Sequence, residues 1–224
     1  MSSSRLRFFE SSVGTKVLIG VTGLFLVLYL IIHIAGNAMF LLGPGVFNAY
    51  ADLLGGNPLI PVIEIVLLAA FLVHIYKTVR MFLKNQDARP VGYARKRRAG
   101  PPSRKTLASS TMIVTGLWLL MFLVIHVRTF RFSEHPETPA GIIDLYRVET
   151  EALASPLAFA FYAISMLIVG SHLWHGVSSG FQSLGFDHPR WTPRVVAFGK
   201  VFAVVIAVGF IGIALVAHLF GAHQ

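Results

Sequence analysis

The sequence predicts an all-α integral membrane protein built as a bundle of five transmembrane helices. Of its 224 residues, 55% are hydrophobic and only 13% are charged, whereas a soluble domain carries about 25% charged residues. Five apolar stretches are long enough to cross a hydrocarbon core about 30 Å thick; they run at about 17–42, 59–83, 107–130, 155–181 and 195–220. Because these stretches are apolar all round and do not alternate, they predict helices rather than the strands of a barrel.

The first stretch is expected to stay in the mature protein. It is longer than the apolar core of a signal peptide, and no small-residue cleavage site follows it. The chain contains no cysteine, which excludes disulfides, thiolate iron–sulfur clusters and covalent haem attachment through C-x-x-C-H. It also has neither G-x-G-x-x-G nor a P-loop, so dinucleotide or ATP chemistry would have to lie on a partner chain.

The distribution of charge predicts the topology. The net charge is +9, and the basic residues gather before the first span and in the second and fourth connections. The positive-inside rule therefore places the N-terminus in the cytoplasm and the C-terminus outside a cell (cytoplasmic or inner) membrane. The basic run "ARKRRAGPPSRK" (94–105) is either a solvated loop that sets this topology or a docking surface for an acidic soluble subunit or anionic lipid. Nucleic-acid binding is not expected.

Two connections on the outer side carry turn signals and short helical stretches. Gly43-Pro44-Gly45 and the segment 55–58 bracket a stretch, 46–54, that predicts a short interfacial helix, and 139–156 predicts another. No internal repeat or low-complexity tract is evident, so residues 1–224 are expected to form a single domain.

Four histidines carry the functional signal. His33, His74, His126 and His172 each lie in a different one of the first four apolar stretches. A single intramembrane histidine can be explained by an interhelical hydrogen bond, but one on each of four helices is harder to explain that way. Neutral imidazole is the usual axial ligand of haem iron, and a six-coordinate haem needs two such ligands from facing helices.

Counting residues from the cytoplasmic end of each span places these histidines at two depths. At 1.5 Å per residue, His33 and His126 lie about 25 and 28 Å from that end, and His74 and His172 both lie about 14 Å from it. We therefore predict two stacked b-type haems, an outer one held by His33 with His126 and an inner one held by His74 with His172. His175 lies three residues after His172, on nearly the same helix face, and is the competing ligand for the inner iron.

Other polar residues near the span ends are candidates for secondary roles. Glu64, near the outer start of the second span, is either a proton-exchanging carboxylate at a quinone site or a residue that caps the start of its helix. Lys77 and Arg128 could meet haem propionates or act as interfacial anchors. The remaining candidates for contacts with a quinone or a propionate are Asn37, His175, Ser179 and Gln182.

The ordered set of segments resembles a known family. "SSVGTKVLIGVTGLFLVLYLIIHIAGN", "EIVLLAAFLVHIYKTVRMFL", "MFLVIHV" and "SHLWHGVSSGFQSLG" are similar to the single-polypeptide, five-helix dihaem cytochrome b anchor of succinate dehydrogenase and fumarate reductase. The resemblance spans nearly the whole chain. It implies that His33 and His126 bind the outer haem and that His74 and His172 bind the inner one. It also favours His172 over His175, because some relatives lack a histidine at the latter position.

The resemblance further implies a role within a succinate:quinone oxidoreductase. Separate flavoprotein and iron–sulfur subunits would carry the dicarboxylate chemistry, and this chain would pass electrons between them and a membrane quinone, either menaquinone or ubiquinone. The sequence does not determine whether that complex assembles into a higher oligomer. Two alternatives also stay open: a dihaem cytochrome b subunit of another respiratory complex, such as a formate dehydrogenase or a hydrogenase, and a transporter that relays protons or a small solute along its histidines.

Overall fold

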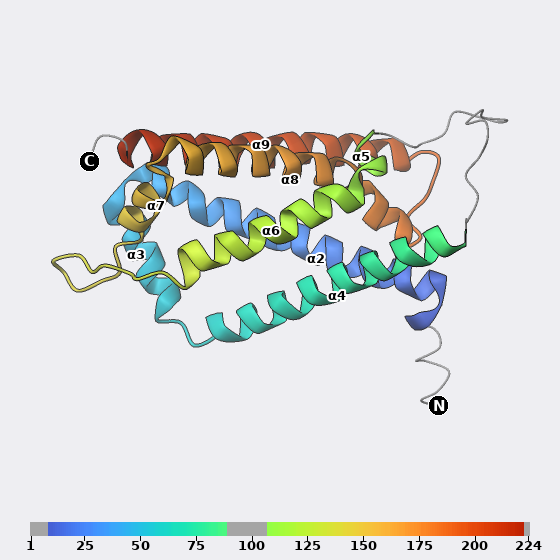
Figure 1. The fold of residues 1–224 in the computed structure, drawn as a ribbon, viewed down its shortest axis with the longest axis horizontal. Coiled ribbons are helices and arrows are strands. Elements are labelled where there is room, and N and C mark those ends of the chain that lie inside the picture. Colours follow the sequence, from blue (N-terminus) through green and yellow to red (C-terminus); the bar gives the residue numbers. More distant parts are fainter. Residues whose placement is uncertain (1–8, 89–106, 222–224) are drawn as a thin grey trace.

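The computed structural model describes residues 9–88 and 107–221, and this part of the chain is a bundle of long helices (Figure 1). Five of them are long and apolar enough to cross a membrane: α2 (Ser12–Ala38, continued by the 3₁₀ turn η1, Met39–Leu42), α4 (Ile60–Asp87), α6 (Met112–Arg131), α8 (Pro156–Ser183) and α9 (Thr192–Gly221). The predicted fold class, an all-α multi-pass membrane bundle, is confirmed.

Capping side chains determine where two of these helices begin. The Ser11 side chain accepts a hydrogen bond from the Gly14 N–H at 3.0 Å, so α2 begins at Ser12 and not at the predicted residue 17. Ser155 accepts from the Ala158 N–H at 3.1 Å and is followed by Pro156, a residue suited to the first helical position. Hydropathy locates the part of a helix that crosses the membrane, whereas capping groups decide where the helix itself starts.

The third predicted span, 107–130, is interrupted in the structure. A short helix, α5 (Leu107–Ser110), is separated from α6 by Thr111, whose φ and ψ of −102° and 5° are not helical. The Thr111 hydroxyl donates to the Leu107 carbonyl at 3.0 Å. The backbone N–H of Thr111 also donates to the Leu107 carbonyl, at 3.1 Å. The long helix of the third span therefore begins at Met112, five residues after the predicted start at about residue 107.

Two short helices, α3 (Pro44–Gly55) and α7 (Leu145–Leu153), lie together at one end of the bundle, as predicted (Figure 1). We call this the outer end, following the predicted topology, and the opposite end the inner end. Asn48, only 3% exposed, joins the two helices: it donates to Asp144 Oδ1 at 2.8 Å and accepts from the Tyr146 N–H at 2.9 Å. Phe40 stacks on Tyr146 with ring centroids 4.3 Å apart and so anchors both helices to the end of α2.

The helices differ in how tightly they pack. α8 and α9 lie side by side along their length (Figure 1), and small residues let them approach: a Cβ added to Gly170 would lie 3.0 Å from Ala207 Cβ. Val177 and Ala203 on these helices are almost fully buried. In contrast, α4 and α6 contain no fully buried residue, and α4 lies at the edge of the bundle opposite α9 (Figure 1). The protein core therefore lies around α2, α8 and α9, while α4 and α6 are joined to it less tightly.

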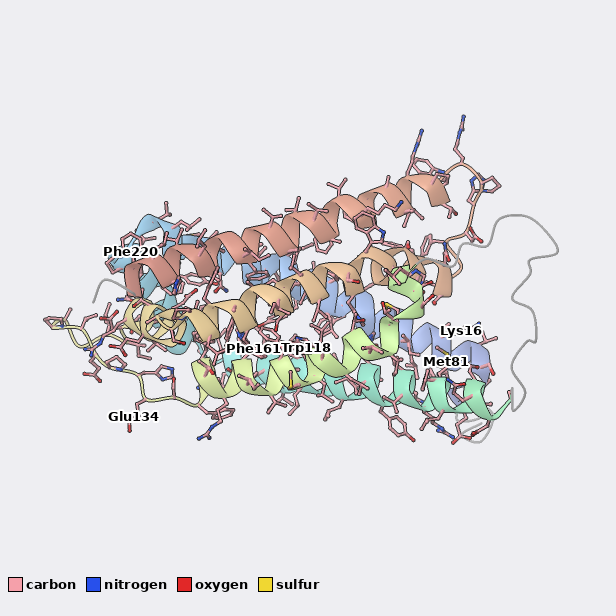
Figure 2. All side chains as sticks on the ribbon, turned by 45° about the horizontal axis from the view of Figure 1, so that its top comes forward. Lys16, Met81, Trp118, Glu134, Phe161 and Phe220 are labelled. Atoms are coloured by element: carbon pink, nitrogen blue, oxygen red, sulfur yellow. The ribbon has the colours of Figure 1, made fainter. Side chains whose placement is uncertain are left out.

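The described ends of the chain lie at opposite ends of the bundle. Figure 2 places Lys16 and Met81 at the inner end and Glu134 and Phe220 at the outer end. An odd number of spans produces this arrangement. The basic run 94–105 lies outside the described residues, and the assignment of the inner end to the cytoplasm stays a prediction.

Candidate functional site

The four singled-out histidines lie on four different helices: His33 on α2, His74 on α4, His126 on α6 and His172 on α8. All four are half-buried. Each helix is apolar over most of its length, so an imidazole here needs a polar partner or a ligand. The partners differ between the outer and the inner pair.

The structure brings His33 and His126 together near the outer end. Their ring centroids are 5.8 Å apart and the rings are perpendicular, at 89°. Each ring is stacked on the aromatic residue one turn earlier in its own helix: Tyr29 lies 5.4 Å from His33 at 19°, and Phe122 lies 5.4 Å from His126 at 28°. The outer pair therefore consists of two facing imidazoles that are held in an aromatic environment.

The inner pair is held by hydroxyl groups. Thr22 Oγ1 on α2 lies 3.2 Å from His74 Nδ1, and Thr115 Oγ1 on α6 lies 3.0 Å from His172 Nδ1. Sequence reasoning did not single out Thr22 or Thr115. A hydroxyl that follows an apolar run and precedes glycine, in both cases within "VTGL", is the signal that could have found them.

This arrangement fits haem ligation. Two protein nitrogens are all that haem iron requires, because the macrocycle supplies the other four ligands. Within residues 9–88 and 107–221, no group of three or more metal-ligating side chains is found, and the rings of His33 and His126 are in contact across α2 and α6. The Nδ1 atom of His126 is buried without a hydrogen-bond partner, so aromatic contacts rather than a hydrogen bond at Nδ1 hold this ring.

Glycine makes room for both inner imidazoles. A Cβ added to Gly23 would lie 3.1 Å from His74 Cε1, and one added to Gly116 would lie 3.7 Å from His172 Cε1. Each inner histidine therefore lies against the backbone of the neighbouring helix at a Thr–Gly step. A larger side chain in place of Gly23 would displace the ring.

Glu64 forms an ion pair at the outer ends of α4 and α6. Its two carboxylate oxygens accept from Arg131 Nε at 2.7 Å and from Arg131 Nη2 at 3.3 Å, and the side chains of Glu64 and Arg131 are 41% and 57% exposed. The alternative interpretation of Glu64 as a helix cap is wrong, because no acidic residue lies in the first turn of α4. Of the two arginines that follow His126, Arg128 is exposed and Arg131 meets the carboxylate.

The other secondary candidates lie apart from one another. Asn37 donates to the His33 carbonyl at 2.8 Å, within its own helix. Lys77 donates to the Phe9 carbonyl at 3.1 Å and so ties the inner part of α4 to the start of α2. His175, Ser179 and Gln182 follow His172 toward the inner end of α8 and are half-buried.

A buried carboxyl group lies at the outer end, outside the spans. Glu149 on α7 is 7% exposed, and burial raises its pKa from 4.5 to about 8. Burial also raises the pKa of the neighbouring Tyr146 hydroxyl, with a smaller contribution from Glu149. The sequence alone does not single out Glu149, because the burial of a side chain on a short helix depends on what packs over that helix.

Comparisons with known proteins leave the family open. No protein-family model matches the chain, and no curated protein matches it.

Proposed function

We propose that this chain is a dihaem cytochrome b: the membrane anchor of a succinate:quinone oxidoreductase that carries electrons between an iron–sulfur subunit and a membrane quinone. The observation that carries the proposal is the position of one histidine on each of four helices, two of which, His33 and His126, bring their rings into contact. At the outer level two rings face each other at 5.8 Å, and at the inner level both rings present Nδ1 to a hydroxyl. The family resemblance of the segments adds the identity of the complex.

The chain's own residues would act by ligation, orientation and burial. His33 with His126 would hold one haem b through their ring nitrogens, and His74 with His172 would hold a second. When bound, haem supplies one-electron chemistry through its iron. The aromatic side chains around His33 and His126 exclude water from the outer pair, and a site that is poor in water favours a neutral imidazole over imidazolium. The helices thus keep four nitrogen lone pairs available inside the membrane.

Quinone chemistry also needs protons, and Glu64 is our candidate for supplying them. Reduction of a quinone to a quinol consumes two electrons and two protons. The Glu64 carboxylate lies at the outer ends of α4 and α6 and is 41% exposed, so it can exchange a proton with water at either oxygen once its bond to Arg131 opens. Among the described residues near His33 and His126, this is a carboxylate with access to both the bundle and the solvent.

The dicarboxylate chemistry would lie on separate chains. The absence of cysteine from the sequence means that iron–sulfur clusters must be held by a partner, and a flavoprotein subunit would oxidise succinate or reduce fumarate. Lys16, Lys77 and Lys84 lie in the inner parts of α2 and α4 and would face these subunits.

Visible spectroscopy of the purified chain tests the proposal. We expect a reduced-minus-oxidised spectrum of haem b and two haems per chain. In His126→Ala, one haem is expected to be lost while the other remains. His218→Ala is the matched control, because His218 lies on α9, where it bonds to the Leu153 carbonyl at 2.8 Å and stacks on Phe159, and it should retain both haems.

Three results would contradict the proposal or part of it. A folded chain that binds no haem when haem is supplied would exclude a cytochrome and favour the histidine-relay transporter. Loss of both haems or of neither in a folded His126→Ala variant would contradict the pairing. Co-purification of the tagged chain with a formate dehydrogenase or hydrogenase subunit, in place of flavoprotein and iron–sulfur subunits of a succinate-oxidising complex, would favour the other respiratory assignment.

A further inference from the structure

The two inner histidines are held in the same way by two different helices. Thr22 on α2 meets His74 Nδ1 at 3.2 Å, and Thr115 on α6 meets His172 Nδ1 at 3.0 Å. In both cases the next residue is a glycine whose missing Cβ leaves room for the Cε1 atom of the same imidazole. Each Thr–Gly step thus contacts two atoms of one ring.

The threonine hydroxyls decide which ring nitrogen carries the proton. A hydroxyl has one proton to donate, and a backbone carbonyl can only accept. Thr22 Oγ1 lies 2.7 Å from the Leu18 carbonyl, and Thr115 Oγ1 lies 3.1 Å from the Thr111 carbonyl. With its proton directed to that carbonyl, each hydroxyl offers a lone pair to Nδ1, which must then be the protonated nitrogen. A neutral imidazole of this tautomer has its free lone pair on Nε2.

The two helices that carry these threonines share a repeated sequence. Residues 21–33, "VTGLFLVLYLIIH", and 114–126, "VTGLWLLMFLVIH", are identical at eight of 13 positions. The expectation that the chain has no internal repeat is therefore wrong. Each copy places a Thr–Gly step eleven residues before a histidine of the outer pair. The repeat also contains the aromatic residue that stacks on that histidine, Tyr29 in one copy and Phe122 in the other.

Each repeated segment therefore contributes at both depths of the bundle. On α2 the segment provides His33 to the outer pair and holds His74. On α6 it provides His126 to the outer pair and holds His172. The outer pair has no corresponding support at His126, since the Nδ1 atom of that ring is buried and unpartnered. The second occurrence of the same contact, on a different helix, argues against an accidental contact of one threonine.

We propose that Thr22 and Thr115 are positioning residues that hold His74 and His172 as Nδ1–H tautomers and direct both Nε2 atoms toward the iron of the inner haem. This inference rests on the proposed function for the identity of the metal group. The orientation of the two rings is a property of the chain itself and can be measured separately. Hydrogen bonds of this kind to a ligating histidine commonly change metal affinity by about 10- to 100-fold when removed.

The first experiment measures the tautomers directly. The full chain, labelled with ¹⁵N-histidine and reconstituted in lipid bilayers without added haem, is compared with Thr22→Val and Thr115→Val by ¹⁵N NMR, with His74→Ala and His172→Ala spectra to assign the signals. We expect Nδ1–H signals for both inner histidines in the wild type, and the loss of one of them in each valine variant. An Nε2–H tautomer for His74 and His172 in the wild type would overturn the proposal, whether or not the chain binds haem.

The second experiment measures retention of the inner haem. Haem transfer from the purified full chain to excess apomyoglobin is followed in the wild type, Thr22→Val and Thr115→Val. We expect the release phase of the inner haem to become about 10-fold or more faster in each valine variant, and the outer phase to stay unchanged. Thr22→Ser and Thr115→Ser, which keep the hydroxyl, should restore the wild-type rate.

Thr78→Val is the matched control for both experiments. Thr78 lies on α4 one turn after His74, and its buried hydroxyl has no hydrogen-bond partner, so its removal should change neither the tautomers nor haem release. Equal effects of Thr78→Val and Thr22→Val, or unchanged haem release in both inner-site variants, would overturn the positioning role. A wild-type chain that binds no haem but shows the two Nδ1–H signals would instead reject the proposed function and leave the orientation of the rings standing.

Discussion

Glu149 provides a prediction about stability whose size follows from the structure. Its side chain is 7% exposed, and burial raises its pKa from 4.5 to about 8. Between these two pH values the folded protein keeps the Glu149 proton, whereas the unfolded chain releases it. Raising the pH therefore favours the unfolded chain, and the free energy of unfolding falls by about 1.4 kcal/mol per pH unit within this window.

From pH 5 to pH 7 this linkage amounts to about 3 kcal/mol from Glu149 alone. The destabilisation is complete above about pH 8, where both states have lost the proton. Unfolding of the detergent-solubilised protein by SDS, followed by circular dichroism at several pH values, measures it. Glu149→Gln keeps the shape of the side chain and removes its titration, so between pH 5 and pH 7 its free energy of unfolding should fall by about 3 kcal/mol less than that of the wild type.

The control is Glu151→Gln, two residues further along α7. The Glu151 carboxylate is 53% exposed and pairs with Arg147 Nε at 2.6 Å. This substitution should cost less than about 1 kcal/mol, as expected for an exposed ion pair, and should leave the pH slope as in the wild type. If Glu149→Gln and the wild type lose stability equally between pH 5 and pH 7, the buried carboxyl group does not carry the linkage and the reasoning is refuted.

Three further predictions concern the bundle and its candidate sites. Gly23→Ala should weaken the inner-haem signal in the visible spectrum, because the added Cβ would lie 3.1 Å from His74 Cε1. Gly116→Ala should retain the wild-type signal, because its Cβ would lie 3.7 Å from His172 Cε1. Equal spectra of the two variants would contradict this ranking. Asn48→Ala should lower the free energy of unfolding by about 1–3 kcal/mol, since it removes a buried side chain that accepts from the Tyr146 N–H and donates to Asp144 Oδ1. A stability equal to wild type in the same SDS titration would show that water replaces the amide. Glu64→Gln should change stability by less than about 1 kcal/mol, because the carboxylate is 41% exposed, but should reduce quinone turnover in the assembled complex by about 100-fold or more; unchanged turnover would remove Glu64 from proton transfer.

The membrane fold could be predicted from the sequence because it depends mainly on the length of the apolar stretches. Apolar stretches of about 20 residues predict spans almost irrespective of detail, and turn residues such as Gly43 and Pro44 marked the start of α3. Counting 1.5 Å per residue along straight helices was also sufficient to group His33 with His126, and these rings lie 5.8 Å apart in the structure. Depth along a helix is a one-dimensional quantity that the sequence contains.

Side-chain contacts between helices could not be predicted, because the sequence does not determine how each helix is rotated about its own axis relative to its neighbours. Thr22 lies 52 residues from His74, and nothing local connects them. Similarly, both Arg128 and Arg131 follow His126, and only the rotation of α6 decides that Arg131 meets Glu64. The non-helical φ and ψ of Thr111, which separate α5 from α6, are a local backbone feature that hydropathy does not register.

The spacing inside the repeated segment has a consequence for how this chain can vary. Eleven residues correspond to about three full turns with only about 20° left over, and to about 16 Å of rise, so Thr22 and His33 project from nearly the same side of α2 at two depths. Exchange of one apolar residue for another between them would keep that alignment. Insertion or deletion of a single residue would rotate one of them by about 100° relative to the other and separate the two levels, so length, rather than composition, is the property that this part of the membrane segment must preserve.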